Sequence, residues 1–394
     1  MSQNKYLKKE LPASLNKIGW MLLVVGAVLG LLGFYVDHSR ALFSYLVAYM
    51  FLVSLGVGSV FLLALEYVAG ADWSVPFRRI IEFTGFITPF LLILAIPLLF
   101  NLEVLFKWAQ PQIVAQDEIL TSKSPYLNTE FFIIRVILFI LIWSAFYFLM
   151  SRNSLKQDLN GDQKLTKINI RLSAIFIPLF ALSISFTSFD WMMSLEPHWF
   201  STIFGVYFFS GTVIAALACA TIFAIPLKEK GYLHSDLNNE HLFSFGALLF
   251  AFVNFWAYIA FSQYLLIWYA DLPEETVWFL TRWQGSWAYF SILLIVIHFL
   301  VPYIILLSQP AKMDPKRLKF SAVWLLFAHL FDLFWLIMPS MQSMEHGYIF
   351  SWIDLVFPVA AIGIVIILFT FKAKNNNLIP IGDPKLQKGL NFHL

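Results

Sequence analysis

A histidine and an aspartate three residues apart lie inside one apolar run, FSAVWLLFAHLFDLFWLIMP (residues 320–339). Residues at this spacing lie on one face of an α-helix, so His329 and Asp332 would be neighbours. An imidazole titrates near neutral pH and can exchange a proton with a carboxylate. The pair therefore predicts either a proton relay or a hydrogen-bonded pair that fixes helix packing, and the sequence leaves both open.

Other polar groups lie in or beside apolar runs, where an ionisable residue costs about 2.5–3.5 kcal/mol to insert into a membrane. The ionisable ones, all candidates for a proton path, are His298, Glu66, Asp354, Asp190, Glu196 and His198; Asn254 and Gln263 share a further run. Each taken alone is also explained by a structural role. Together they would form a polar seam across the membrane if the fold brought them together. We expect no catalytic residue in the chain.

The sequence contains few side chains that could ligate a metal ion or a redox cofactor. The single cysteine, Cys219, excludes a CxxCH haem attachment and a cysteine-held iron–sulfur cluster within the chain. His298 and His329 are the remaining candidates, as axial ligands of a b-type haem. Counted at about 1.5 Å per helical residue, their depths differ by roughly 6 Å, which disfavours a shared haem. We therefore expect neither a metal nor a redox cofactor here.

The connector SFDWMMSLEPHWFST (residues 188–202) is acidic and aromatic and contains no Lys or Arg. Short translocated loops avoid Lys and Arg but tolerate Asp and Glu, and tryptophan suits the headgroup level of a membrane. We therefore place this segment on the outer face. Trp191 and Trp199 are interpreted as an interfacial aromatic belt, which competes with a role for the acidic groups as proton acceptors.

The composition indicates a membrane protein, with 60% hydrophobic and 13% charged residues against about 45–50% and 25% in soluble domains. Ten apolar runs approach or exceed the roughly 20 residues that a spanning helix needs. They are residues 18–36, 42–66, 84–106, 131–150, 170–189, 202–226, 243–268, 285–308, 320–339 and 350–371. We predict an all-α integral membrane fold, with an N-terminal segment (1–17), a membrane domain (18–371) and a polar tail (372–394) that is either a docking segment or disordered.

The distribution of positive charge predicts the orientation. On the N-terminal side of these spans lie 21 of the 26 Lys and Arg residues. By the positive-inside rule, both termini are then cytoplasmic and the number of spans is even. The net charge of +2 gives no basis for binding nucleic acid.

The segment SFDWMMSLEPHWFSTIFGVYFFSG (residues 188–211) resembles the signature of the ActF family. ActF is a large membrane subunit of bacterial alternative complex III, a quinol:cytochrome c oxidoreductase, and is similar to the NrfD/PsrC-like membrane proteins. The resemblance extends over nearly the whole chain. It implies two four-helix bundles, spans 2–5 and 6–9, flanked by spans 1 and 10.

The resemblance also implies a multi-pass subunit of the bacterial inner membrane that works in respiratory electron transport. The expected partners are the sister subunit ActC, an iron–sulfur/molybdopterin-like subunit, multihaem and monohaem cytochrome c subunits, lipids and, in some assemblies, a terminal oxidase. Quinol, haem c and iron–sulfur clusters would belong to those partners. This chain would serve as scaffold and as a possible proton-translocation path.

Two departures argue against a working quinol site in this subunit. The segment SISFT (183–187) lacks the histidine that the sister subunit carries there, and His198 precedes Trp199 where the sister motif has a histidine after the tryptophan. Two other functions remain open, an independent secondary transporter and a purely structural anchor. Transporters often have helices broken at matching positions, and the predicted break at residues 56–58 has no counterpart.

Overall fold

The computed structural model describes residues 11–341, 344 and 347–393, so the first ten residues of the predicted N-terminal segment lie outside it. The described chain is helical and contains no strand. Ten of its helical segments are long and apolar enough to cross a membrane: Ala13–Val36, His38–Ala69, Val75–Leu99, Thr129–Asn160, Lys164–Leu195, Phe204–Glu229, Asn239–Ala270, Trp287–Leu306, Pro315–Ser340 and Ile353–Asn375. The predicted all-α integral membrane fold is confirmed.

Eight spans are built on one continuous helix each. These helices are α1 (Ala13–Val36), α2 (His38–Ala69), α8 (Thr129–Asn160), α9 (Lys164–Trp191), α10 (Phe204–Glu229), α11 (Asn239–Ala270), α16 (Pro315–Ile337) and α17 (Ile353–Asn375). Short 3-10 turns extend α9 and α16: η5 (Met193–Leu195) and η7 (Met338–Ser340).

The third and eighth spans are interrupted. The third comprises η2 (Val75–Phe77), α3 (Arg78–Gly85), η3 (Thr88–Phe90) and α4 (Leu91–Leu99), and the eighth comprises α13 (Trp287–Leu294), the π-helix η6 (Ile295–Leu300) and α14 (Val301–Leu306). Proline explains part of this, because it lacks the N–H that an α-helix needs: Pro89 lies in η3, and Pro302 is the second residue of α14, just after η6.

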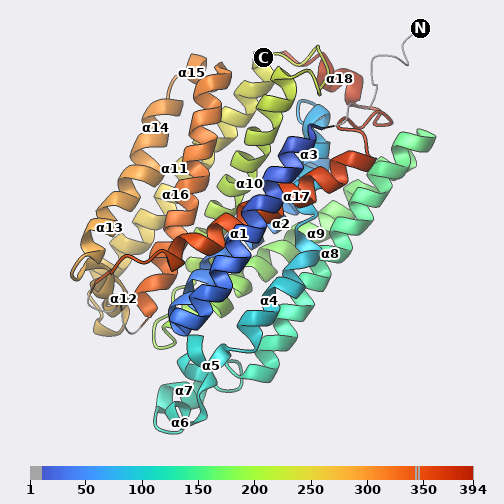
Figure 1. Ribbon diagram of the computed structural model, residues 1–394. Helices are drawn as coiled ribbons and strands as arrows, with labels where there is room; N and C mark the ends of the chain where they lie inside the picture. Colours follow the sequence, from blue (N-terminus) through green and yellow to red (C-terminus); the bar gives the residue numbers. More distant parts are fainter. Residues whose placement is uncertain (1–10, 342–343, 345–346, 394) are drawn as a thin grey trace.

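Short helices lie in the connections between spans. They are α5 (Leu102–Leu105), η4 (Lys107–Ala109), α6 (Pro111–Val114), α7 (Glu118–Lys123), α12 (Pro273–Trp283), α15 (Gln309–Met313) and α18 (Leu386–Leu390). Helices α5–α7 and α12 lie at the lower end of the molecule in Figure 1, whereas α15 and α18 lie at the upper end, where the C-terminus is marked.

The spans pack as the predicted two bundles. In the first, α2 contacts α3, α4, α8 and α9; in the second, α10 and α16 contact each other, and α11 and α14 complete the group. Helix α2 joins the two bundles because it also contacts α10 and α16. Its apolar stretch is buried throughout, unlike that of any other span. Helices α1 and α17 pack on each other and against α2, as flanking spans.

Helix α2 is continuous through Gly56, Val57 and Gly58, so the predicted break there is wrong. These glycines allow close packing. A Cβ on Gly58 would lie 2.8 Å from the carbonyl oxygen of Thr212 on α10, and one on Gly56 would lie 3.2 Å from the Thr88 backbone nitrogen. The missing side chains therefore bring α2 close to its neighbours in both bundles.

The C-terminal tail is ordered from residue 376 to residue 393 and packs on the ends of the spans. Asp383 is buried and forms an ion pair with Arg78. His241 at the start of α11 lies 2.8 Å from the carbonyl oxygen of Gly389, and Lys385 donates to the carbonyl oxygen of Gly70. The tail therefore contacts both bundles at this end.

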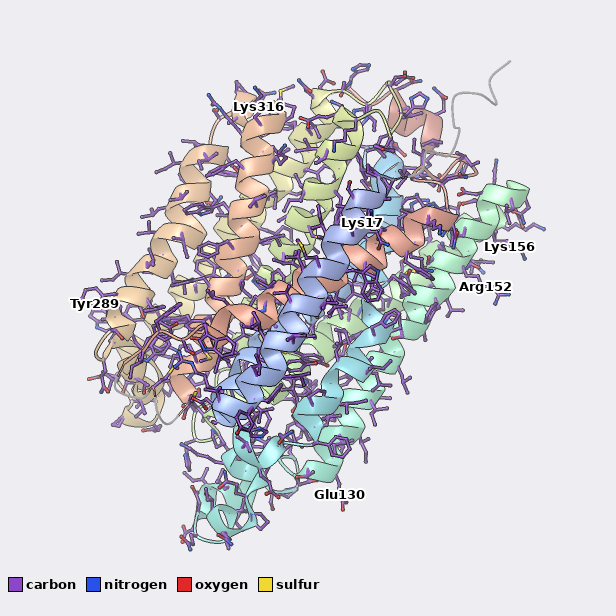
Figure 2. The ribbon with its side chains drawn as sticks, in the orientation of Figure 1. Lys17, Glu130, Arg152, Lys156, Tyr289 and Lys316 are labelled. Carbon is purple, nitrogen blue, oxygen red and sulfur yellow. The ribbon has the colours of Figure 1, made fainter. Side chains whose placement is uncertain are left out.

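Basic side chains gather at the same end as the C-terminus. Figure 2 labels Arg152, Lys156 and Lys316 toward this end, which we call the basic end, and Glu130 toward the opposite end. The connector between α9 and α10 lies at the opposite end, because it contacts α7 and α12. The sorting of charge that the sequence predicts is thus reproduced by the fold.

Candidate functional site

His298, His329 and Asp332 converge in the second bundle. Each offers one ligand or proton-carrying atom, and these three atoms lie within 4.8 Å of one another. All three residues are buried. Helix α16 places His329 and Asp332 on one face, as their spacing predicts, and η6 of the neighbouring span adds His298. We call these three residues the His–Asp cluster.

The π-helix η6 sets the position of His298. Single π-helical turns within α-helices are uncommon and are often found at functional sites. The indole of Trp324 donates to the carbonyl oxygen of Ile297 at 2.7 Å, which satisfies one acceptor in the widened turn. The ring of His298 stacks on Trp256 of α11, with the ring centroids 3.9 Å apart.

Asp332 is held by two neutral donors. The hydroxyl of Tyr207 donates to Oδ1 at 2.5 Å, and the indole N–H of Trp256 donates to Oδ2 at 3.1 Å. Among the described residues no Lys or Arg forms an ion pair with this carboxylate. A buried carboxyl without a cation gains little from staying ionised, because leaving water disfavours the charged form. This geometry suits a group that changes its protonation state.

The two histidines have free nitrogens. Nε2 of His329 lies 2.9 Å from the hydroxyl of Ser54 on α2, but its Nδ1 and both ring nitrogens of His298 have no partner within the described chain. Gly211 leaves room for His329, since a Cβ there would lie 2.8 Å from Nδ1. A neutral imidazole offers one donor and one acceptor, so these nitrogens can receive or release protons.

The depth estimate that separated His298 from His329 is wrong. Their nitrogens lie within the 4.8 Å of the cluster, not at depths about 6 Å apart. The estimate assumed straight α-helices perpendicular to the membrane, whereas η6 interrupts the eighth span and the helices in Figure 1 are tilted against one another. Trp256 packs on the ring of His298, and the missing side chain of Gly211 makes room for the ring of His329.

Asp190, in contrast, is fully paired. Arg135 of α8 reaches it with two nitrogens, Nε to Oδ2 at 2.8 Å and Nη2 to Oδ1 at 2.9 Å. The hydroxyl of Tyr126 also donates to Oδ1 at 3.0 Å. The acidic connector therefore does not neutralise Asp190 itself; a cation from another span does so.

The rest of the connector binds neighbouring loops. His198 is exposed and lies 2.6 Å from Asp117 at the start of α7, and the pKa of Asp117 is lowered by the backbone N–H of Leu120 and by this histidine. Glu196 is half-buried, and its charge acts on the guanidinium of Arg282.

The predicted aromatic belt is wrong for Trp191 and Trp199, because both are buried. Trp191 packs against Tyr49 and Phe132, and Trp199 stacks on Trp278 of α12 with centroids 4.5 Å apart. Their aromatic surface lies between helices and not at the lipid headgroups.

Glu66 and Asp354 have arginine partners as well. Glu66 accepts from Nε of Arg78 at 2.5 Å, beside the pair of Arg78 with Asp383. Asp354 accepts from Arg40 at 2.6 and 3.0 Å. Of the eight predicted proton-path residues, the fold thus brings together only the His–Asp cluster. Within the described residues no direct hydrogen bond joins it to the other five.

Four functional neighbours were missed at the sequence level. Tyr207 and Trp256 form hydrogen bonds with Asp332, and Ser54 forms one with His329. Arg282 is a buried cation near the connector. Tyr207 lies in the family-like segment 188–211, which is the one available signal. The others stand in a chain with 18% aromatic residues and many serines, so their types alone do not mark them.

Arg282 lacks a carboxylate in ion-pair contact among the described residues. Its Nη atoms donate to the carbonyl oxygens of Trp278 and Leu336, and its guanidinium lies 3.5 Å from the centroid of the Trp278 ring. Burial lowers the pKa of Arg282 to about 9, against the field of Glu196. Arg282 is thus a buried group on α12, beside the second bundle, that no carboxylate neutralises within the described chain.

The arrangement can hold and move a proton in the membrane interior. Two imidazoles, a carboxyl and the Tyr207 hydroxyl are within reach of one another, and no cation within the described chain pairs with the carboxyl.

Compared with known proteins, the chain matches no family model and no curated protein.

Proposed function

We propose that this chain is a membrane subunit of a bacterial quinol:cytochrome c oxidoreductase of the alternative complex III type, in the inner membrane with both termini in the cytoplasm. In this proposal, partner subunits hold the haems and iron–sulfur clusters. The chain supplies the scaffold in its first bundle and a proton-transfer site in its second.

One observation carries the proton-transfer part: a buried histidine–aspartate cluster without a cation partner, placed by a π-helix. Buried ionisable groups in membrane spans are costly, and a structural role is better served by pairing them. The first bundle shows such pairing at Asp190 and Glu66. The likeness of residues 188–211 to the ActF signature supports the choice of complex.

Membership of a complex is tested by purification. An affinity tag on this chain, extracted in mild detergent from its native membrane, should bring down subunits with c-type haem absorbance and iron–sulfur signals. Under the proposal these subunits carry quinol:cytochrome c activity. Isolation of a stable chain alone, from membranes that retain that activity elsewhere, would contradict the proposal.

A secondary transporter is the principal alternative. The interrupted third and eighth spans resemble the broken helices of transporters, which favours it, whereas the continuous α2 removes the break first expected there. Uptake of a solute by vesicles that contain this chain alone would support the alternative. The purely structural anchor differs in predicting no effect of Asp332 on proton movement.

A further inference from the structure

A cavity of about 680 Å³ lies in the second bundle, next to the His–Asp cluster. Its wall is formed by α10, α11, α12, α13, η6 and α16. Tyr258 and Phe261 of this wall are 66% and 61% exposed on the outer surface of the membrane span α11. The cavity therefore borders the lipid-facing surface, and a ligand would reach it from the bilayer.

The wall of the cavity is aromatic and suits a planar ring. Its aromatic members are Tyr207, Trp256, Tyr258, Phe261, Tyr264, Trp278, Phe279, Trp283, Phe299 and Trp335. Aromatic side chains stack on flat π-systems face to face or edge to face, and such pairs add about 0.5–1.5 kcal/mol each beyond burial of area. A flexible acyl chain would gain no such stacking.

One polar group of the wall has an unused hydrogen. Gln263 is 4% exposed, and its amide nitrogen Nε2 has no hydrogen-bond partner in the described chain. A buried donor of this kind is costly unless a ligand accepts from it. The ligand should therefore present an acceptor oxygen. Behind Trp278, the guanidinium of Arg282 adds a positive field that favours electron-rich oxygen.

The inner end of the cavity touches the proton-transfer site. Tyr207 and Trp256 line the cavity, and these are the two residues that donate to Asp332. Trp256 also stacks on His298. A ring bound in the cavity would thus share two side chains with the His–Asp cluster, and its binding would act on the hydrogen bonds of Asp332.

We infer that this cavity binds the ring of a lipid-soluble quinone or quinol, with an oxygen of the ring accepting a hydrogen bond from Gln263. The choice of a quinone among ring compounds rests on the proposed function. This inference departs from the expectation that the subunit has no working quinol site: residues 183–187 belong to α9 of the first bundle, whereas the cavity lies in the second.

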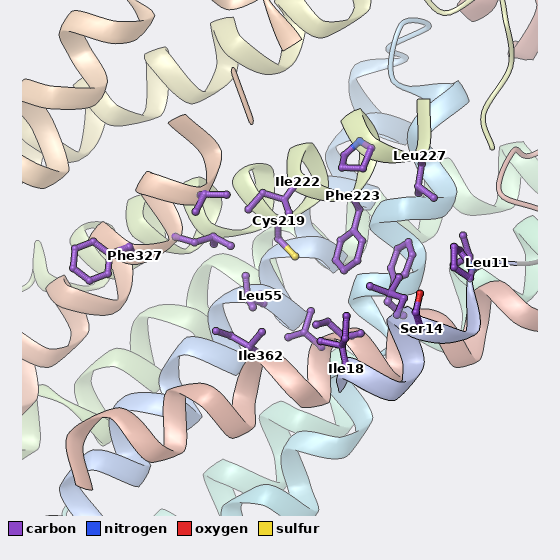
Figure 3. Close-up of a pocket in the computed structure, with 18 of the residues that line it drawn as sticks. Leu11, Ser14, Ile18, Leu55, Cys219, Ile222, Phe223, Leu227, Phe327 and Ile362 are labelled. Carbon is purple, nitrogen blue, oxygen red and sulfur yellow. The ribbon is translucent and has the colours of Figure 1, made fainter. Parts of the chain in front are cut away.

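A second cavity provides the contrast and the control. It has about 620 Å³ and lies between α1, α2, α10, α16 and α17, with Leu55, Cys219, Ile222, Phe327 and Ile362 among its lining residues (Figure 3). Its lining is predominantly aliphatic and phenyl, and it includes none of the buried side-chain atoms that lack a partner. Its polar lining residues, Ser14, Lys230 and Tyr232, contribute no buried unpartnered atom like the Gln263 amide nitrogen.

Binding is tested on the full chain in nanodiscs made of quinone-free lipid. Decylubiquinone is titrated while tryptophan fluorescence is recorded, because four tryptophans line the cavity and quinones quench them. We expect saturable quenching. Gln263→Leu should weaken it about fivefold to tenfold, as the loss of one hydrogen bond predicts, and Ala260→Phe should weaken it more by filling the cavity. Ile222→Phe, in the second cavity, should leave the affinity unchanged.

Quenching that rises linearly with concentration, or equal affinity in Gln263→Leu and the unaltered chain, would overturn the inference. So would equal displacement by oleate, since that would indicate a site for acyl chains. Crosslinking of the unaltered chain with an azidoquinone gives a readout without mutation: label should fall on α11 and α12, and label confined elsewhere would also overturn it. Neither result bears on co-purification, so failure here leaves the proposed function to its own test.

Discussion

Around the first bundle the buried carboxylates of the described chain face arginines, whereas in the second bundle Asp332 faces a tyrosine, a tryptophan and two histidines. Asp190 pairs with Arg135, Glu66 with Arg78 and Asp354 with Arg40. Asp332 has no such partner in the described chain, and neither has Arg282. Both regions bury ionisable groups, but only the paired carboxylates have a cation beside them that favours the charged form. The difference separates groups that hold helices together from groups that can change protonation.

The largest expected effect comes from breaking a pair in the first bundle. Arg135→Met leaves Asp190 buried and unpaired, which should destabilise the chain by about 3–5 kcal/mol. Thermal unfolding in nanodiscs measures it, with Arg152→Met as control, because Arg152 is exposed on the same helix. The double variant Arg135→Met/Asp190→Asn should recover much of the loss. Equal stability of the Arg135 and Arg152 variants would contradict the structural role of the pair.

A smaller effect is expected from crowding the second bundle. Gly211→Ala places a methyl group 2.8 Å from Nδ1 of His329, so the ring must shift, at a cost of about 1–3 kcal/mol. Removing the ring as well, in Gly211→Ala/His329→Ala, should cost less than the sum of the single changes. If the losses of unfolding free energy in the two single variants are additive, the methyl group at position 211 does not act through the ring of His329.

Neutralising Asp332 should change stability less than either of these. Asp332→Asn keeps an acceptor for Tyr207, loses the acceptor for the Trp256 indole and removes a buried carboxyl that no cation compensates. The last two changes offset each other, so we expect a shift within about 1 kcal/mol in either direction. The same unfolding assay decides it. A loss as large as that of Arg135→Met would mean that Asp332 is a structural group, and the comparison between the bundles would fail.

The smallest effect is expected at the exposed pair of Asp117 and His198. The folded chain lowers the pKa of Asp117, so its contribution to stability is present above the usual carboxyl range and is lost as the pH falls through the lowered pKa. Asp117→Asn should lower the melting temperature by about 1 °C at pH 6. The difference should vanish at a pH well below the lowered pKa of Asp117. A difference that persists there would assign the effect to the helix cap alone.

The fold was largely predictable, because ten long apolar runs and the sorting of Lys and Arg leave little choice of topology. The His329–Asp332 pair was predictable as well, since i and i+3 share a helix face. The third residue of the His–Asp cluster, His298, was not predictable, because a π-helix places it and no residue type in the sequence indicates a π-helix. The partners of Asp190, Glu66 and Asp354 come from 12 to 314 positions away in the chain, a separation that local spacing does not encode.

The measurement that tests the account most directly is the number of protons moved per electron by the complete assembly in proteoliposomes, with quinol and cytochrome c supplied. We predict that Asp332→Asn lowers this ratio while electron transfer continues. Arg135→Met/Asp190→Asn, which removes a paired carboxylate of the first bundle, should leave the ratio unchanged. An unaltered ratio in Asp332→Asn would contradict a proton-transfer role for the second bundle.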